Sequence, residues 1–260
     1  MSGLPAADGA RALLHVAFPV LDEEGQLEES VERTLAYCAA RRLERCEFCI
    51  ADNGSTDRTP EIGRALAARH PRIRYLRVPR RGFGLALKTA WGGSTADYVG
   101  YMDIDLATDL RHLAEVYDHV AAGADYRLYL GSRLKRGASV GNRTLFRAAA
   151  SRAFNLLLRA RLGVSITDAM CGFKFVERRL YDALAARCAF TDDWFFATQL
   201  AVRAEWAGAR IMEMPVVWRD QPNSKSAVRF LDLSRLYLAG IAELKREMRE
   251  SRVRDAGRAG

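Results

Sequence analysis

The sequence lacks any apolar stretch of the length that a membrane-spanning helix requires. Crossing the hydrocarbon core of a bilayer takes about 20 mostly apolar residues in succession, and charged or polar residues interrupt every apolar stretch before that length. The N-terminal segment MSGLPAADGA also lacks the basic residues followed by an apolar stretch that mark a secretory signal peptide. We therefore expect neither a transmembrane helix nor a signal peptide, and we expect the protein to lie in the cytoplasm.

Cysteine is scarce, and its pattern excludes two common roles. Among the five cysteines, only Cys46 and Cys49 form a Cys-x-x-Cys pair, and no second pair completes a zinc site. The pair lies in RCEFCI, a predicted strand, so burial explains it better than redox chemistry. An odd cysteine count without a secretion signal indicates a reducing compartment. Internal repeats and low-complexity segments are also missing, which excludes a repeat architecture.

The composition is that of an ordinary globular protein with an excess of positive charge. The 260 residues are 49% hydrophobic and 28% charged, which suits one α/β domain, or a core domain with a small appendage. The net charge of +8 and the isoelectric point of about 9.5 favour nucleic acid, acidic lipid or phosphorylated substrates as partners. Charge alone does not choose among these partners.

Short apolar segments alternate with longer amphipathic segments in the first half of the chain. This alternation predicts an α/β fold with a mostly parallel sheet covered by helices. We expect strands at 13–20, 47–51, 73–78, 98–102 and 126–130, and helices at 28–40, 60–69, 85–91 and 110–121. The second half predicts helices at 145–162, 194–206 and 229–249, strands near 167–175 and 210–218, and a disordered tail at 252–260.

Three polar clusters follow predicted strands, at 52–55, 103–105 and 131–133. Ligands bind beyond the carboxyl ends of strands in such sheets, so we expect the clusters to lie at one edge. Asp103 and Asp105 are spaced i, i+2, and in an extended chain such side chains point the same way. Two carboxylates on one side suit Mg²⁺ or Mn²⁺, which then bridge to phosphate oxygens. Taken alone, a surface turn or a helix cap is the commoner explanation of such a pair.

Three weaker signals have simple structural explanations beside functional ones. Asp52 either accepts hydrogen bonds from a nucleobase or belongs to a turn and helix cap in 52–57. The segment 80–86 either binds an anion at a helix N-terminus or forms a plain turn. Arg147 and Ser151, spaced i, i+4 on one helix, either bind a phosphate together or lie on a solvated face.

The motifs of the chain are, in order, FPVLDE (18–23), ADNGSTD (51–57), RRGFGLALKTAW (80–91), YMDIDLATDL (101–110), LGSRL (130–134), SRAFNLLLRARLG (151–163), ITDAMCGFKF (166–175), WFFATQL (194–200) and MPVVWRDQPNSK (214–225). Taken together, they resemble the motifs of the family 2 glycosyltransferases of GT-A fold, and in particular those of the bacterial branch of the dolichyl- and polyprenyl-phosphate glucose and mannose synthases. The resemblance spans about residues 13–230.

The resemblance implies a GT-A fold, in which a Rossmann-like, mostly parallel sheet is flanked by helices. It implies a catalytic domain at 1–227, followed at 228–260 by a basic amphipathic helix and a disordered tail. The implied activity is inverting transfer of a hexose from an NDP-sugar, of the UDP-glucose or GDP-mannose type, to a polyprenyl or dolichyl phosphate. Mg²⁺ or Mn²⁺ is the implied cofactor.

The resemblance also implies roles for individual residues. Asp103 and Asp105 would bind the metal and, through it, the nucleotide diphosphate; together with Arg133 they would carry catalysis. The other implied residues are Pro19, Glu23, Asp52, Ser224 and Lys225 for the donor nucleotide, Arg133, Arg147 and Ser151 for the acceptor phosphate, and Asp168 in support of the site.

Two segments depart from the family pattern. Ala197 and Gln199 stand where relatives usually have an aspartate and a glutamate; either the nearby Asp192 and Asp193 compensate, or the acceptor differs. Val20 and Leu21 replace the usual Tyr-Asn after the first strand, which affects the expected choice of nucleotide. A phosphate acceptor tolerates the missing carboxylates, because its second pKa near 6 leaves it largely dianionic and in no need of a general base.

Other functions remain open at this stage. The acceptor is alternatively a soluble natural-product intermediate or phosphorylated small molecule. A second alternative is an inactive relative, which the intact Asp103 and Asp105 disfavour. A third is a non-catalytic basic binding protein. The sequence has no recognised nucleic-acid-binding motif, so we expect no binding to nucleic acid. The basic helix at 229–249 either lies on the inner face of an anionic membrane as a peripheral contact or packs on the domain with its charges in solvent.

Overall fold

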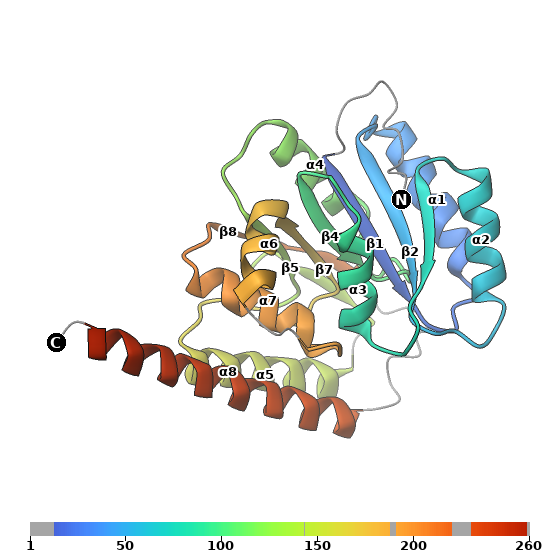
Figure 1. The fold of residues 1–260 in the computed structure, drawn as a ribbon. Helices are drawn as coiled ribbons and strands as arrows, with labels where there is room; N and C mark the ends of the chain where they lie inside the picture. The colour runs from blue at the N-terminus through green and yellow to red at the C-terminus, as the bar shows by residue number, and fades with distance from the viewer. Residues whose placement is uncertain (1–12, 143, 188–190, 220–229, 259–260) are drawn as a thin grey trace.

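The fold is a seven-stranded sheet covered by helices on both faces (Figure 1). The computed structural model describes residues 13–142, 144–187, 191–219 and 230–258. The strands are β1 (Leu14–Val20), β2 (Cys46–Asp52), β3 (Ile73–Arg77), β4 (Tyr98–Met102), β5 (Leu128–Ser132), β6 (Ser139–Gly141), β7 (Phe173–Glu177), β8 (Ile211–Pro215) and β9 (Val217–Arg219). The helices are α1 (Leu27–Ala40), α2 (Thr59–Arg69), α3 (Phe83–Gly92), α4 (Arg111–Ala121), α5 (Leu145–Leu162), α6 (Arg178–Arg187), α7 (Phe195–Trp206) and α8 (Phe230–Arg258).

The strand order in the large sheet is β3-β2-β1-β4-β7-β5-β8. All neighbours pair in parallel except β7, which runs antiparallel to both β4 and β5. β2, β4 and β5 therefore point in the same direction and end at the same edge of the sheet. The predicted α/β fold with a mostly parallel sheet is confirmed.

Two apolar cores lie one on each face of the sheet, and successive strand residues point alternately into one core and the other. Ala17 packs with α3, α5, α6, α7 and α8, whereas its neighbours Val16 and Phe18 pack with α1, α2 and α4. Successive strand side chains point to opposite faces, so these apolar strands are covered on both sides. Burying each large apolar side chain stabilises the fold by roughly 1.5–3 kcal/mol relative to exposure.

The second half of the chain differs from the sequence-based expectation in its strands and in one additional helix. The strand expected at 210–218 is divided: β8 joins the large sheet, whereas β9 pairs with β6 in a separate two-stranded sheet. Pro215, which has no N–H to donate, is the last residue of β8. The helix α6 was not expected, because its segment RRLYDALAAR follows directly on β7 without a turn signal.

The C-terminal helix α8 packs against the body of the protein and is longer than expected. A Cβ atom at Gly240 would lie 2.3 Å from the ring of Phe195, so glycine permits a close approach of α8 to α7. The Tyr237 ring contacts both Phe154 and Phe195 edge to face. α8 passes its expected end at Arg249 and reaches Arg258, through most of the segment expected to be disordered. Three arginines and two alanines in that segment are good helix formers. No helix in the described ranges has both the length and the apolar character needed to cross a bilayer.

Candidate functional site

The loops with most of the expected site residues meet at one edge of the large sheet. Asp52 is the last residue of β2, Asp103 follows β4, and Arg133 follows β5. The three strands end at the same edge because they run in the same direction. The predicted convergence of the three polar clusters is therefore confirmed.

Asp103 is held in place by the neighbouring strand. Its N–H donates to the Gly172 carbonyl (3.1 Å), which extends the antiparallel pairing of β4 with β7 by one residue. A Cβ atom on residue 172 would lie 1.7 Å from Oδ2 of Asp103. Glycine at this position therefore makes room for the carboxylate.

Asp103 and Asp105 lie in a turn, which corrects the expectation of an extended chain. β4 ends at Met102, and the Leu106 N–H donates to the Asp103 carbonyl (3.2 Å). Leu106 has φ = 51°, a left-handed conformation that is unfavourable for a residue with a side chain. Oδ1 of Asp105 accepts a hydrogen bond from the Ala107 N–H (3.0 Å). The turn buries Ile104 and leaves the aspartates on either side of it half-buried.

The electrostatics of this turn suit a divalent cation. Burial and the charge of Asp105 raise the pKa of Asp103 to about 7, against the opposing effect of Lys174. A cation bound to both carboxylates would reverse this shift by favouring their ionised forms. Within the described part of the chain, no group of three or more His, Cys, Asp or Glu residues is arranged to hold a metal. The pair fits Mg²⁺ or Mn²⁺, which usually complete their ligands with water and substrate phosphate oxygens.

Lys174 is a candidate site residue that sequence reasoning missed. It lies on β7 with 3% of its surface exposed and lines the same small cavity as Asp103. Its ammonium donates to the Tyr101 hydroxyl (3.2 Å) and to the Cys171 carbonyl. Burial lowers its pKa to about 8. The only signal in the sequence was a lysine inside the apolar segment CGFKF.

Arg133 and Asp168 form a bidentate ion pair. Nε and Nη2 of Arg133 donate to Oδ2 and Oδ1 of Asp168 (2.7 and 3.0 Å), and the Arg133 backbone N–H also donates to Oδ2 (3.1 Å). Burial alone would raise the pKa of Asp168, but the guanidinium lowers it below the usual value. The Arg133 guanidinium also lies 5.6 Å from the centroid of the Trp218 ring. These contacts fix the orientation of the guanidinium at the sheet edge.

The helix α5 connects Ser151 to the Asp168 segment through Asn155. Nδ2 of Asn155 donates to the Ser151 carbonyl (2.9 Å), and Oδ1 of Asn155 accepts from the Ala169 N–H (2.9 Å). The hydroxyl of Ser151 is buried and has no hydrogen-bond partner among the described residues. Arg147, half-buried, lies in the first turn of the same helix, where its N–H donates to the capping Thr144 hydroxyl (3.3 Å). Asn155 is a second residue that the sequence analysis did not single out.

Asp52 is fully buried and already has protein partners. The Ser55 N–H donates to its Oδ1 (2.8 Å), and the Tyr75 hydroxyl donates to its Oδ2 (2.6 Å). These bonds match the turn explanation of this segment. A contact of Asp52 with a nucleobase stays a prediction.

The other expected donor residues lie near the ends of β1 and β2 or outside the described residues. The Glu23 N–H donates to the Thr59 hydroxyl (2.8 Å), and Pro19 is half-buried on β1 opposite Ala51 of β2. Ser224 and Lys225 lie outside the described residues.

The two carboxylates proposed to compensate for Ala197 and Gln199 have other contacts. Asp192 forms ion pairs with Lys88 and Arg80, which lower its pKa. Oδ1 of Asp193 accepts from the Phe195 N–H (2.8 Å) at the start of α7. Gln199 is buried and its Oε1 accepts from the Thr191 N–H (3.3 Å). Both aspartates therefore have partners within the protein, and compensation for Ala197 and Gln199 by either of them stays a prediction.

Comparison with known proteins gives one family and a consistent set of relatives. The family model described as "Glycosyl transferase family 2" matches residues 16–185. "Glycosyltransferase AglD" of Haloferax volcanii is 37% identical over 223 residues, which cover 85% of this chain and 35% of the relative. "Dolichyl-phosphate beta-glucosyltransferase ALG5C" of Trichomonas vaginalis is 29% identical, with 81% and 65% covered. "Polyprenol monophosphomannose synthase" of Mycolicibacterium smegmatis is 27% identical, with 79% and 77% covered.

This chain thus spans about a third of the length of the first relative and about two thirds of the second. Among solved structures, glucosyl-3-phosphoglycerate synthase from Mycobacterium tuberculosis in complex with UDP superposes with a TM-score of 0.66 at 21% identity, over 93% of this chain and 83% of the other. The same protein with Mn²⁺, UDP and phosphoglyceric acid gives a TM-score of 0.64 at 24% identity, over 93% and 81%. At this level of identity the likeness establishes the fold.

Proposed function

We propose that this chain, which belongs to glycosyl transferase family 2, is a hexosyltransferase that moves a hexose from an NDP-sugar, of the UDP-glucose or GDP-mannose type, to a polyprenyl or dolichyl phosphate. The observation that carries this proposal is the common sheet edge shared by the Asp103–Asp105 turn and the Arg133–Asp168 pair. A carboxylate pair suited to a metal and a fixed guanidinium suited to a phosphate meet the needs of transfer between two phosphorylated substrates.

The donor half of the proposed reaction uses Asp103 and Asp105. A bound Mg²⁺ or Mn²⁺ would offset the negative charge that develops on the nucleotide diphosphate as it leaves. Gly172 and the Leu106 turn keep the two carboxylates in place before the donor arrives. Pro19, Glu23, Asp52, Ser224 and Lys225 are proposed to line the rest of the nucleotide site.

The acceptor half uses Arg133, Arg147 and Ser151 to hold the attacking phosphate. Asp168 orients the Arg133 guanidinium through two hydrogen bonds, and the buried Ser151 hydroxyl retains its capacity to donate to a phosphate oxygen. A dianionic phosphate oxygen attacks the anomeric carbon directly and needs no proton removed. The other contacts of Asp192 and Asp193 are consistent with a reaction that uses no general base.

The relatives support a lipid acceptor by what their names state. Dolichyl-phosphate and polyprenol transferases recur among them. A second acceptor class, a soluble phosphorylated molecule, is supported by the fold neighbour that binds phosphoglyceric acid. We further propose that 1–227 is the catalytic unit, and that α8 contributes to a peripheral contact with the inner face of the membrane.

The donor site is tested by calorimetric titration of UDP, GDP and their sugar conjugates, with and without Mn²⁺. We expect one nucleotide to bind only with the metal, and Asp105→Ala to weaken that binding by at least about tenfold, because one of two protein ligands to the cation is lost. The matched control is Asp118→Ala, which removes an exposed carboxylate from α4. Equal binding with and without metal, or equal affinity in the two variants, contradicts the proposed donor site.

A further inference from the structure

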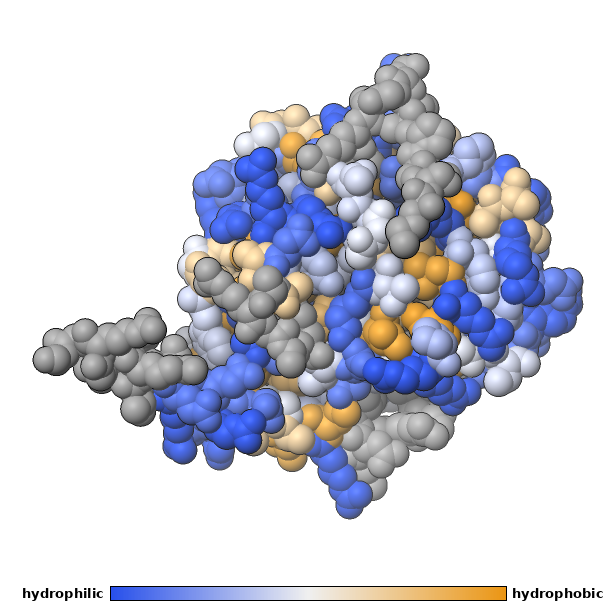
Figure 2. Space-filling model, in the orientation of Figure 1, coloured by the Kyte–Doolittle hydropathy of each residue, from blue (hydrophilic) through white to orange (hydrophobic). Residues whose placement is uncertain are grey.

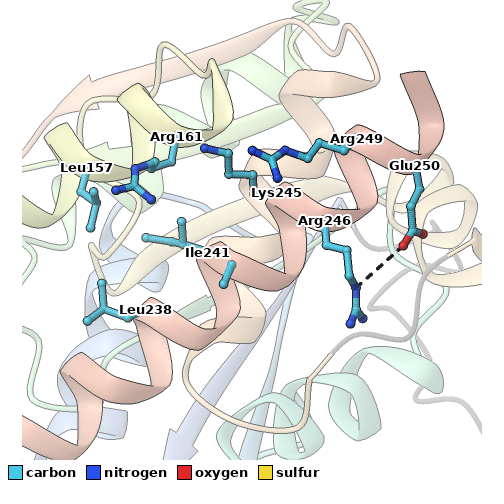
Figure 3. A pocket seen from close by; sticks show the side chains of 9 residues that line it. Leu157, Arg161, Leu238, Ile241, Lys245, Arg246, Arg249 and Glu250 are labelled. Carbon is cyan, nitrogen blue, oxygen red and sulfur yellow. Dashed lines mark ion pairs between the residues drawn. The ribbon is translucent and has the colours of Figure 1, made fainter. Parts of the chain in front are cut away.

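A groove of about 460 Å³ lies between α5 and α8 (Figure 3), and its lining residues are distinct from the candidate site residues described above. The larger apolar side chains that line it belong to Leu157, Leu238 and Ile241. The cationic side chains that line it belong to Arg161, Lys245, Arg246 and Arg249. Among the described residues, Glu250 is the only acidic residue that lines the groove, and it pairs with Arg246 (3.9 Å). The groove is therefore both apolar and strongly positive.

Most of this positive charge is uncompensated. Arg246 has carboxylate partners in Glu243 (2.8 Å) and Glu250. Within the described ranges, no carboxylate pairs with Arg161, Lys245 or Arg249. Three cations without counter-ions around one groove favour an anionic ligand.

The surface beside the groove is apolar on the outward face of α5. Leu145 is 89% exposed and Leu156 is 60% exposed. At 100° per residue these two side chains fall within about 20° of each other around the helix axis, and the exposed residues Ala149, Ala153 and Ala160 belong to the same outward face. Arg152 and Arg159 are also exposed and flank this strip. Figure 2 shows apolar surface beside hydrophilic surface along the lower edge of the molecule, where Figure 1 places α5 and α8.

We propose that the groove between α5 and α8 binds the phosphate headgroup of an anionic phospholipid, with the outward strip of α5 in the adjoining apolar layer. The cations would bind the phosphate, and the Leu157, Leu238 and Ile241 side chains would contact the hydrocarbon chain attached to it. A soluble phosphate compound or a nucleic acid would make no use of the exposed Leu145 and Leu156. The groove ligand is a bulk membrane lipid and is distinct from the sugar acceptor.

The inference rests on the proposed lipid acceptor, and it predicts where the acceptor site lies relative to the membrane surface. Ser151, in the proposed acceptor site, and Arg161, in the groove, are both on α5, and ten residues of helix span about 15 Å. A headgroup bound at Arg161 would hold α5 against the bilayer surface. The phosphate of a lipid acceptor in the same surface would then lie within reach of Ser151.

The test is co-sedimentation of the full chain with phosphatidylcholine vesicles, with and without phosphatidylglycerol. We expect binding only to the anionic vesicles and at least about a tenfold loss in Lys245→Glu/Arg249→Glu, because each reversed charge near the surface costs binding energy. The matched control is Arg33→Glu/Arg41→Glu, which reverses two exposed arginines of α1 and its C-cap. A third variant, Leu156→Ser, is expected to weaken vesicle binding without any change of charge.

The outcomes separate this inference from the proposed function. If both charge-reversal variants lose vesicle binding equally, the contact is a general effect of net charge and the groove assignment is wrong. If the groove variant alone fails to bind inorganic phosphate while Leu156→Ser binds vesicles normally, the ligand is a free phosphate and the lipid assignment is wrong. UDP titration on the same variants shows whether the donor site is intact, so that a failed groove does not imply a failed transferase, and thermal melting checks that each variant is folded.

Discussion

At the residue scale, the position of Asp103 depends on the absence of a side chain at residue 172. A Cβ atom there would lie 1.7 Å from the carboxylate oxygen, so we expect Gly172→Ala to displace Asp103 and to reduce Mn²⁺-dependent nucleotide binding by at least about tenfold. Overpacking is also expected to lower the free energy of unfolding by about 1–3 kcal/mol. Calorimetric titration gives the first quantity, and urea denaturation gives the second.

The matched control for this prediction is Gly92→Ala, at the end of α3. A Cβ atom at that position has no neighbour within 4 Å, so binding and stability are expected to stay close to those of the unchanged protein. Normal metal-dependent binding by a folded Gly172→Ala protein would mean that Asp103 does not need its observed position. Asp103 would then be removed from the proposed metal ligands.

At the element scale, the buried side chain of Asn155 links α5 to the Asp168 segment by hydrogen bonds. Asn155→Leu leaves the Ala169 N–H without its partner, which is expected to cost about 1–3 kcal/mol of stability. The same change loosens the junction between Ser151 and the Arg133–Asp168 pair. We therefore expect the KM for the acceptor to rise while the metal-dependent affinity for the nucleotide stays the same.

Steady-state kinetics with varied acceptor, beside nucleotide titration, measures both effects. Ala36→Leu introduces the same side chain on the exposed face of α1, away from both proposed sites, and serves as the control. An equal loss of nucleotide and acceptor binding in Asn155→Leu would indicate a general loss of structure. An unchanged acceptor KM would mean that α5 takes no part in acceptor binding.

At the scale of the whole molecule, the sequence was a good guide to the fold and a partial guide to the site. Regular alternation of apolar and amphipathic segments predicted the parallel sheet and the shared edge at which β2, β4 and β5 end. It did not predict β7 as an antiparallel central strand, since strand direction depends on long-range pairing that period-2 patterns do not encode. The division of 210–218 into β8 and β9 depends in the same way on which strands are available as partners.

Site residues that lie close together in the sequence could be predicted from it. Site residues that only the fold brings together could not. Asp103 and Asp105 stand out by spacing, but Lys174 and Asn155 each appear as a single polar residue in an apolar segment. Their importance comes from contacts that the fold creates: Lys174 meets Tyr101, 73 residues earlier, and Asn155 meets Ala169, in the next loop, 14 residues later. Asp192 stands out in the sequence near the altered motif, but its ion pairs with Arg80 and Lys88, more than 100 residues earlier, became visible only in the structure.

The central claim is that this glycosyltransferase moves a hexose to a lipid phosphate, and sugar transfer itself tests it most directly. The measurement uses radiolabelled UDP-glucose and GDP-mannose with Mn²⁺, offers either a polyprenyl phosphate or phosphoglyceric acid, and counts label in the organic and aqueous products. We predict label in the lipid fraction with one donor, dependent on metal and strongly reduced in Arg133→Ala. Transfer to phosphoglyceric acid alone, or release of free sugar with no transfer to either acceptor, would contradict the account.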